Sequence, residues 1–331
     1  MVKRMWPTIL AMIAFAGNSL LARLALADGA IDAAGFTALR LVSGAAVLAV
    51  IVFAPWSAPR SRREQQGGRA AAASAPRTRL EGSLVATLAL FAYALFFSLA
   101  YLRLGAAVGA LILFASVQAT MIATGLARGE RPSVREAAGL ALAFGALVWW
   151  LLPGLTRPDP LGLSLMVASG VAWGVYSLKG RGARDPVAAT AGNFIFAVPL
   201  ALPLLAVSML GLSGPAFHGL GVSELNLSGS RLSSPGGPAS TDSPIVGTIT
   251  LEGALIACFS GGVTSALGYI LWYRALAGLT ALAAAIVQLS VPVIAAVGAV
   301  LFLNEPLTAR FAIAGSLVIL GIGFALVSKR R

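Results

Sequence analysis

Polar side chains within long apolar stretches are the residues of this chain best placed to do chemistry. Arg40 stands about eight residues into the second such stretch, and Asn18 stands near the middle of the first. An arginine there can bind a carboxylate through two parallel hydrogen bonds, or it can satisfy helix-end carbonyls and pair with Asp28 or Asp32. Asn18 either contacts a substrate or joins two helices. Arg23, nearer the end of its stretch, is expected to extend its charge toward the aqueous interface.

Two glutamines and a set of aromatic residues are further candidates. Gln118 and Gln288 each offer two donors and an acceptor, so they either read a substrate's amino or carboxyl group or join helices. Trp272 is expected in the belt of aromatic residues at the membrane interface. The remaining aromatic candidates either line an apolar pocket or pack in the core, and Phe97 is among them. The predicted substrate site comprises Asn18, Arg40, Tyr93, Gln118, Trp173, Tyr176, Asn193, Tyr269 and Gln288.

The ionisable residues argue against an enzyme. The chain has one histidine, His218, in a polar segment, and its acidic residues fall near the ends of apolar stretches. A Ser/His/Asp triad or a histidine-based metal site is therefore nearly excluded, and we expect no catalytic residue, metal or cofactor. The single cysteine, Cys258, can form no disulfide within the chain. The net charge of +12 is spread over many short loops, which disfavours nucleic acid as a partner.

The apolar stretches are long enough to cross a lipid bilayer. Hydrophobic residues make up 58% of the chain and charged residues 11%, whereas charged residues make up about a quarter of soluble domains. A membrane helix needs roughly 20 mostly apolar residues, and continuous Ala-, Leu- and Gly-rich runs favour helices over membrane β-strands. The sequence thus predicts an all-α integral membrane protein. Its ten expected spans are 5–27, 33–56, 82–102, 104–127, 134–155, 160–178, 186–212, 251–273, 275–303 and 306–328.

The basic residues predict how these spans are oriented. With alternating sides, 18 Lys or Arg residues fall on the side that holds both termini and four on the other. Cytoplasmic loops carry such an excess, so both termini and the segment 57–79 are expected in the cytoplasm. The segment 213–244, rich in Ser, Gly and Pro, is expected to be a flexible external loop. Arginine outnumbers lysine 21 to 3, which is typical of GC-rich bacteria and favours a bacterial cytoplasmic membrane.

The two halves of the chain echo each other. Residues 32–40 align without a gap to 185–193, which matches Arg40 with Asn193; a short match of 16–19 with 173–176 precedes this one in both halves, and a match of 129–132 with 304–306 follows it. Each half holds five helices, an odd number, so the second half enters the membrane from the opposite side. Inverted repeats of this kind are typical of secondary transporters. The predicted repeats are residues 1–156 and 157–331.

These residues resemble the EamA-type ten-helix members of the drug/metabolite transporter superfamily. The best match is 276–292 and its continuation 300–306, which is similar to the family's penultimate helix with a central proline and a closing Glu-Pro turn. Residues 36–40 resemble the entry of its second helix. The resemblance implies a ten-helix basket with a central cavity and export of small metabolites, amino acids among them. One departure is Gln118, which stands near where a proline matching Pro292 is expected.

Several functions are compatible with ten membrane helices. The favoured hypothesis is a secondary transporter that exports small metabolites by alternating access, with a small-molecule substrate and the lipid bilayer as its partners. A lipid or polyprenyl-carrier flippase is also built from inverted repeats. It differs from an exporter in that its cavity opens sideways to lipid. A membrane-embedded lipid enzyme needs a polar constellation that the sequence lacks. A channel is disfavoured because no filter sequence is found.

Overall fold

The computed structural model describes six stretches of the chain: 2–27, 29–54, 80–154, 157–210, 249–303 and 305–327. They contain ten helices long and apolar enough to cross a membrane. Within these stretches no β-strand forms, and one isolated antiparallel bridge joins Ile31 and Ile249. The predicted class, an all-α protein with ten membrane helices, is confirmed for this part of the chain. The segments 57–79 and 213–244, predicted to be loops, lie outside the described residues.

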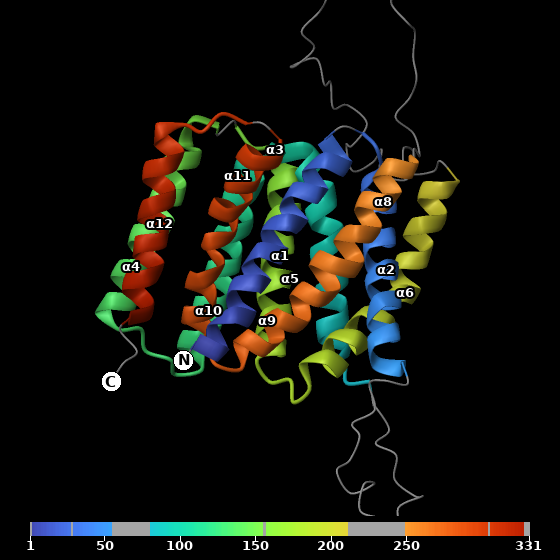
Figure 1. The fold of residues 1–331 in the computed structure, drawn as a ribbon, viewed down its shortest axis with the longest axis horizontal. Coiled ribbons are helices and arrows are strands. Elements are labelled where there is room, and N and C mark those ends of the chain that lie inside the picture. Colours follow the sequence, from blue (N-terminus) through green and yellow to red (C-terminus); the bar gives the residue numbers. More distant parts are fainter. Residues whose placement is uncertain are drawn as a thin grey trace, which may run out of the picture.

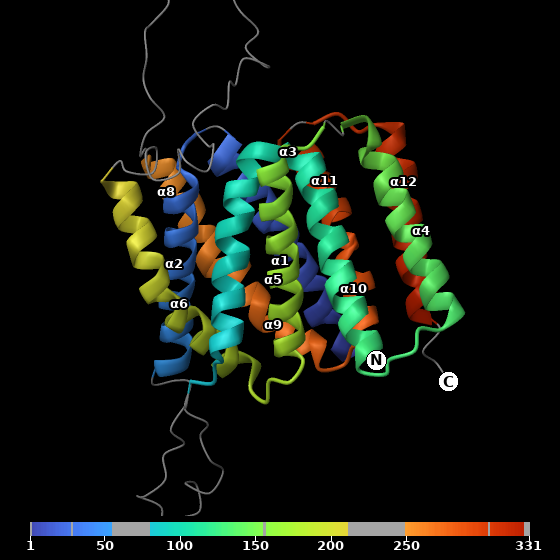
Figure 2. The ribbon, with the colours of Figure 1, turned by 180° about the vertical axis from the view of Figure 1, so that it is seen from behind.

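The first half of the chain forms five spans from four helices. These are α1 (Val2–Ala27), α2 (Ala33–Phe53), α3 (Leu84–Ala127) and α4 (Val134–Leu151), which ends in the short 3-10 helix η3 (Leu152–Gly154). The α3 helix contains two spans, Leu84–Leu104 and Ala106–Ala127. Figures 1 and 2 show that α3 reverses direction at the face opposite the two chain ends. The break predicted between 102 and 104 is therefore a tight helical reversal.

The second half also forms five spans, two of them irregular. The regular helices are α5 (Pro160–Gly180), α6 (Pro186–Met209) and α12 (Ala309–Val327). The eighth span runs from α8 (Leu251–Phe259) through the π-helix η5 (Ser260–Leu267) into α9 (Gly268–Leu276). The ninth span is divided into α10 (Ala281–Gln288) and α11 (Ser290–Phe302).

Polar caps set where the helices begin. The Asp32 carboxylate accepts a hydrogen bond from the Gly35 N–H at 2.8 Å, and Thr280 accepts one from the Ala283 N–H at 3.1 Å. Such caps satisfy backbone donors that the first helical turn leaves unpaired. The Thr280 cap explains why the ninth span begins at Ala281 and not at the predicted residue 275.

The division of the ninth span follows from Pro292. Proline has no N–H to donate to the Gln288 carbonyl, so the regular ladder cannot continue. The Leu289 N–H bonds to the Ile286 carbonyl at 3.1 Å, one residue short of the α-helical partner. By contrast, Gln118, which stands near where a matching proline was expected, lies within α3, and α3 stays helical through it. The two spans thus differ in helix shape.

The helices form a single layered bundle (Figures 1 and 2). The pair α4 and α12 packs at one end of the long axis, and α2 packs with α6 and α8 toward the other. Between them lie α1, α3, α5, α9, α10 and α11. Small residues allow the closest approach in this centre. A Cβ on Gly170 of α5 would lie 2.6 Å from the Ser116 Cβ of α3, so the Gly-x-x-x-Gly spacing at 170 and 174 serves close packing.

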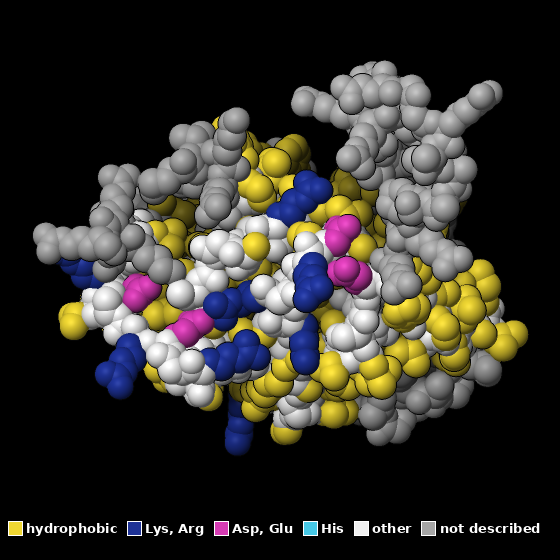
Figure 3. All heavy atoms as spheres, turned by 90° about the horizontal axis from the view of Figure 1, so that it is seen from below, with side chains coloured by type: hydrophobic (Ala, Val, Ile, Leu, Met, Phe, Trp, Pro, Cys, Tyr) yellow, Lys and Arg dark blue, Asp and Glu magenta, His cyan; other side chains and the backbone are white. Residues whose placement is uncertain are grey.

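The first and last described helices, α1 and α12, begin and end at the same face of the bundle (Figure 1). Figure 3 views this face and shows Lys and Arg side chains gathered near its centre, with a few Asp and Glu among them and hydrophobic residues around the rim. We call it the termini face. The basic residues at the helix ends and turns on this face are Arg128, Arg131, Arg135, Lys179, Arg181, Arg184 and Arg274.

Candidate functional site

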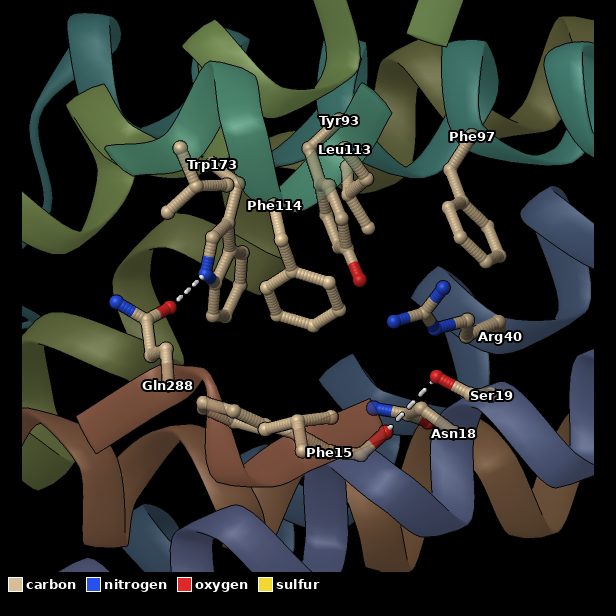
Figure 4. A pocket seen from close by; sticks show the side chains of 12 residues that line it. Phe15, Asn18, Ser19, Arg40, Tyr93, Phe97, Leu113, Phe114, Trp173 and Gln288 are labelled. Atoms are coloured by element: carbon tan, nitrogen blue, oxygen red, sulfur yellow. Dashed lines mark hydrogen bonds between the residues drawn. The ribbon is translucent and has the colours of Figure 1, made fainter. Parts of the chain in front are cut away.

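A narrow cavity lies in the centre of the bundle, between helices of both halves. It is lined by α1, α2, both spans of α3, α5, α10 and α11; the lining residues are Phe15, Asn18, Ser19, Arg40, Tyr93, Phe97, Leu113, Phe114, Val117, Trp173, Gln288 and Val291. Asn18 follows Trp6, the first residue of its span, by 12 positions, or ~18 Å along a helix. The cavity therefore lies near mid-membrane, with polar and aromatic side chains facing one another (Figure 4).

Arg40 of α2 is the one buried charged residue among the described residues, with 3% of its surface exposed. Its Nε donates to the Ser265 hydroxyl of η5 at 2.9 Å, and its Nη2 donates to the Tyr269 hydroxyl of α9 at 2.7 Å. The guanidinium also lies over the Tyr93 ring, 5.5 Å from its centroid. All three partners are neutral. Among the described residues, no Asp or Glu carboxylate lies within 4.0 Å of the Arg40 guanidinium.

The alternative of an Arg40–Asp32 ion pair is not found. Asp32 instead caps α2 and accepts a hydrogen bond from the Ser208 hydroxyl at 2.5 Å, so its carboxylate is already engaged. Asp28 lies outside the described residues. Arg23 does not simply extend to the interface: it forms an ion pair with Glu305 on the face opposite the termini face, and both side chains are more than a third exposed.

Asn18 lies beside Arg40 and is joined to it through a shared hydroxyl. Its Oδ1 accepts hydrogen bonds from Ser260 at 2.8 Å, Thr264 at 2.5 Å and Ser265 at 3.2 Å. The Ser265 oxygen accepts from Arg40, so its one hydrogen is directed to Asn18. This arrangement fixes the amide with its oxygen toward η5, and Figure 4 shows the nitrogen on the cavity side.

The opposite end of the cavity is closed by an indole and an amide. The Trp173 Nε1 of α5 donates to the Gln288 Oε1 at 2.6 Å, while Gln288 Nε2 lies 3.1 Å from the Ala284 carbonyl and 3.2 Å from the Met121 sulfur. Phe15 of α1 meets the Trp173 ring edge-on, with ring centroids 5.1 Å apart. Such edge-to-face contacts give an aromatic wall a defined geometry. Gln288 thus both lines the cavity and holds two helices together.

Five of the nine predicted site residues come together here: Asn18, Arg40, Tyr93, Trp173 and Gln288. Tyr269 touches the site indirectly, through its hydrogen bond to Arg40 and its ring contact with Trp173 at 5.0 Å. Gln118 points at a neighbouring helix and donates from Nε2 to the Ala285 carbonyl at 2.8 Å.

Asn193 and Tyr176 belong to a cluster nearer the termini face, which adjoins the cavity where the Tyr176 ring stacks on Trp173 with centroids 5.6 Å apart. The Asn193 Oδ1 accepts from the Ser83 N–H at 3.2 Å, and its Nδ2 donates to the Tyr273 hydroxyl at 3.3 Å. The Tyr176 ring packs on Tyr273 with centroids 5.0 Å apart. Asn193 therefore does not share the cavity with Arg40, although the two residues match in the aligned halves.

The expectation that Trp272 lies in an interfacial belt is wrong. Its side chain is fully buried, and its Nε1 donates to the Ser177 hydroxyl of α5 at 3.0 Å. Burial between α1 and α5 satisfies the indole inside the protein, so no interface is needed. Several of the other lining residues were not predicted from the sequence, among them Phe15, Phe114 and Val291. Ordinary apolar residues in an apolar helix carry no signal of the face they occupy.

Two ion pairs near the bundle's faces complete the electrostatics. Arg103, at the α3 reversal, pairs with Asp159 at 2.8 Å, and the pKa of Asp159 is held below its ordinary value by the Gly162 N–H and then by Arg103. At the termini face Glu130 pairs with Arg181 at 2.9 Å. Partial burial opposes ionisation of Glu130, but hydrogen bonds from the Ala281 N–H and Arg181 outweigh this effect and keep its pKa low.

In the part of the chain that the structure covers, no His, Cys, Asp or Glu cluster could hold a metal ion.

The cavity is narrow in this conformation. A water molecule can occupy only about 30 Å³ of it, which is room for one or two waters. A metabolite needs several hundred Å³. The helices must therefore separate before a ligand of that size can enter.

The fold defines a multi-pass membrane protein whose two halves meet at a central cavity. The profile of the EamA-like transporter family matches residues 237–327. An uncharacterized protein of Pseudomonas aeruginosa, PA1977, is 44% identical over 324 residues, covering 98% of this chain and 94% of that protein. The chain belongs to the EamA-like transporter family, within the drug/metabolite transporter superfamily. A crystal structure of another protein, 18% identical, covers 99% of both chains with a TM-score of 0.66, which shows a shared fold.

Proposed function

We propose that this protein is a secondary transporter that exports small metabolites across a bacterial cytoplasmic membrane by alternating access, amino acids being among the candidate substrates. One observation carries the proposal: helices from both halves enclose a mid-membrane cavity in which the buried Arg40 has no acidic partner among the described residues. A charge at that depth is retained at a cost that a passing substrate can offset.

The pairing of helices supports two inverted repeats, 1–156 and 157–331. The α1 helix packs against α9 and α11, and α5 packs against α3, the element in the matching place of the other half. The α2 helix packs against its counterpart α6, and α4 against its counterpart α12. Exchange of the two halves thus reproduces the same set of neighbours. That relationship is what alternating access by two related halves needs.

The charge distribution supports a cytoplasmic termini face. Lys and Arg side chains gather on this face (Figure 3). The described basic residues in its turns outnumber those in the turns opposite, which are Arg103, Arg157 and Arg310. The positive-inside rule then places both termini in the cytoplasm. The bacterial relative supports a bacterial membrane.

Export is tested in two steps. First, a strain that overproduces the protein is compared with an empty-vector strain for growth tolerance to a panel of amino acids, organic acids and their toxic analogues. Compounds that are tolerated better are then loaded, as radiolabelled solutes, into proteoliposomes of the purified protein, and efflux is followed. Saturable efflux faster than from protein-free liposomes supports the proposal. Lack of both tolerance and efflux across the panel contradicts it.

A further inference from the structure

Two nitrogen donors lie side by side at one end of the cavity, and they deepen the proposed function by naming a substrate class. Arg40 contributes a guanidinium, which has five N–H donors and no acceptor. Asn18 turns its amide nitrogen toward the cavity because its oxygen is taken by three hydroxyls of η5. Figure 4 shows the two residues side by side at one end of the cavity.

Two acceptors of the lining, an amide and a carbonyl oxygen, are already in use. The Gln288 Oε1 receives the Trp173 indole at 2.6 Å, and the Phe15 carbonyl receives the Ser19 hydroxyl at 3.4 Å. No Asp or Glu is among the lining residues. A substrate's ammonium group would find hydroxyl lone pairs and the faces of aromatic rings, and the Tyr93 face is already covered by Arg40. A cation placed there would also be repelled by the Arg40 charge.

The rest of the lining is apolar. Phe15, Phe97, Phe114 and Trp173 contribute aromatic surface, and Leu113, Val117 and Val291 contribute aliphatic surface. A ligand that binds its charged end at Arg40 must place the rest of its body against these groups. Burial of an apolar body there is favourable, whereas a second charge or several hydroxyls would be left without partners.

We propose that the substrate is an apolar organic monocarboxylate, whose carboxylate binds between Arg40 and Asn18 and whose hydrocarbon body lies among the aromatic residues. Arg40 presents a planar fork that matches a carboxylate. The anion neutralises the one buried charge of the cavity, so the loaded site is electrically balanced where the empty site is not. The corresponding amino acid is a poorer ligand because its ammonium group finds no carboxylate, only hydroxyl lone pairs, and meets a like charge.

The test uses four probes that share a phenyl group: 3-phenylpropionate, L-phenylalanine, 2-phenylethylamine and 3-phenylpropan-1-ol. Binding to the purified protein in detergent is measured by calorimetry at constant pH. We expect 3-phenylpropionate to bind about tenfold or more tighter than the alcohol, since hydrogen bonds to charged groups contribute at least that factor. In Arg40→Gln the anion and the alcohol should bind alike. The matched control Arg103→Gln removes an arginine outside the cavity and should keep the preference.

A second variant covers the case in which Arg40→Gln does not fold. Asn18→Asp places a carboxylate beside Arg40, so the protein then carries its own counter-ion. We expect a higher melting temperature without ligand and loss of the anion preference. The proposal is overturned if the amine or phenylalanine binds as tightly as the anion, if the anion shows no saturable binding at millimolar concentrations, or if Arg40→Gln or Asn18→Asp, in folded protein, keeps the preference.

The proposed export function and this inference fail in distinguishable ways. Arg40-dependent binding of the anion without efflux of any compound from proteoliposomes upholds the site and contradicts transport. Efflux of amino acids that does not change in Arg40→Gln upholds transport and contradicts the assignment of the substrate class.

Discussion

Glu130 and Arg181 form an ion pair at 2.9 Å that ties the end of α3 to the end of α5 at the termini face. The same carboxylate accepts the backbone N–H of Ala281, the first residue of α10, at 2.9 Å. One side chain therefore holds three helices together on this face. On the other face Arg23 and Glu305 join α1 to the turn before α12. Both faces are bridged at once, in agreement with the narrow cavity between them.

Replacing Glu130 should loosen the termini face. Glu130→Gln loses the charge that Arg181 and the Ala281 N–H both contact, and we expect a loss of about 1 kcal/mol in unfolding free energy. Thermal melting in detergent measures this. Glu305→Gln serves as the comparison, with a smaller expected loss because its ion pair is more exposed. An equal or larger effect at Glu305 would contradict the ranking.

The Glu130 contribution should also depend on pH in a defined direction. Its pKa in the folded protein lies below its ordinary value, so its stabilising contribution is present above the unfolded pKa of about 4.3 and is lost as the pH falls through the folded pKa. The difference in melting temperature between the parent and Glu130→Gln should therefore be constant at neutral pH and shrink below about pH 4. A difference that grows on acidification would rule out this assignment.

Arg40→Lys should impair transport more than stability. Lysine keeps the positive charge but cannot donate to Ser265 and Tyr269 with a fixed fork while it also presents a planar face to a carboxylate. We expect efflux to fall about tenfold or more, with a melting temperature only a few degrees lower. Ser265→Ala, which removes one acceptor and leaves the guanidinium, should reduce efflux less. If efflux of Arg40→Lys falls only in step with its stability, Arg40 is a structural residue.

Asn193→Ala should affect stability and leave the cavity unchanged. The asparagine satisfies the Ser83 N–H at the start of α3 and donates to the Tyr273 hydroxyl, and both groups lose a buried partner in the variant. The expected loss is about 1–3 kcal/mol. Calorimetry should give unchanged affinity for 3-phenylpropionate. A weakened affinity in a well-folded variant would return Asn193 to the site.

The contact between α4 and α12 should tolerate no side chain at residue 139. A Cβ there would lie 2.5 Å from the Gly321 carbonyl and 2.7 Å from the Ala325 Cβ. Gly139→Val is expected to lose about 1–3 kcal/mol through overpacking. Gly145→Val, on the same helix with nothing within 4 Å of an added Cβ, is the matched control and should melt like the parent.

The proposed orientation can be tested with single cysteines in a Cys258→Ser background. Gly182 and Leu307 are exposed and lie in turns at opposite faces of the bundle. In intact cells an impermeant thiol reagent should label Leu307→Cys and should label Gly182→Cys only after permeabilisation. The reverse pattern would place the termini face outside.

Hydropathy alone was enough to predict the ten spans, because a bilayer demands the same apolar length from each of them. It could not predict which way a buried residue faces. All nine predicted site residues are buried, yet Gln118, Tyr176, Asn193 and Tyr269 do not line the cavity. In a helix that is apolar on every side, nothing in the local sequence separates the face toward a cavity from the face toward a neighbour. The π-helix η5, which orients Asn18, likewise had no sequence signal.

The break at Leu289 carries a mechanical consequence. The Ala285 carbonyl, which a straight helix would pair with the Leu289 N–H, is instead held by the Gln118 amide of α3. If the ninth span became straight at Leu289, the Gln118 amide would lose the Ala285 carbonyl as its acceptor. Within the membrane no water is present to replace it. The continuous helix α3 therefore supports the ninth span at the point where that span is divided into α10 and α11. Any movement of α10 relative to α3 must therefore break or re-form the hydrogen bond between Gln118 and Ala285.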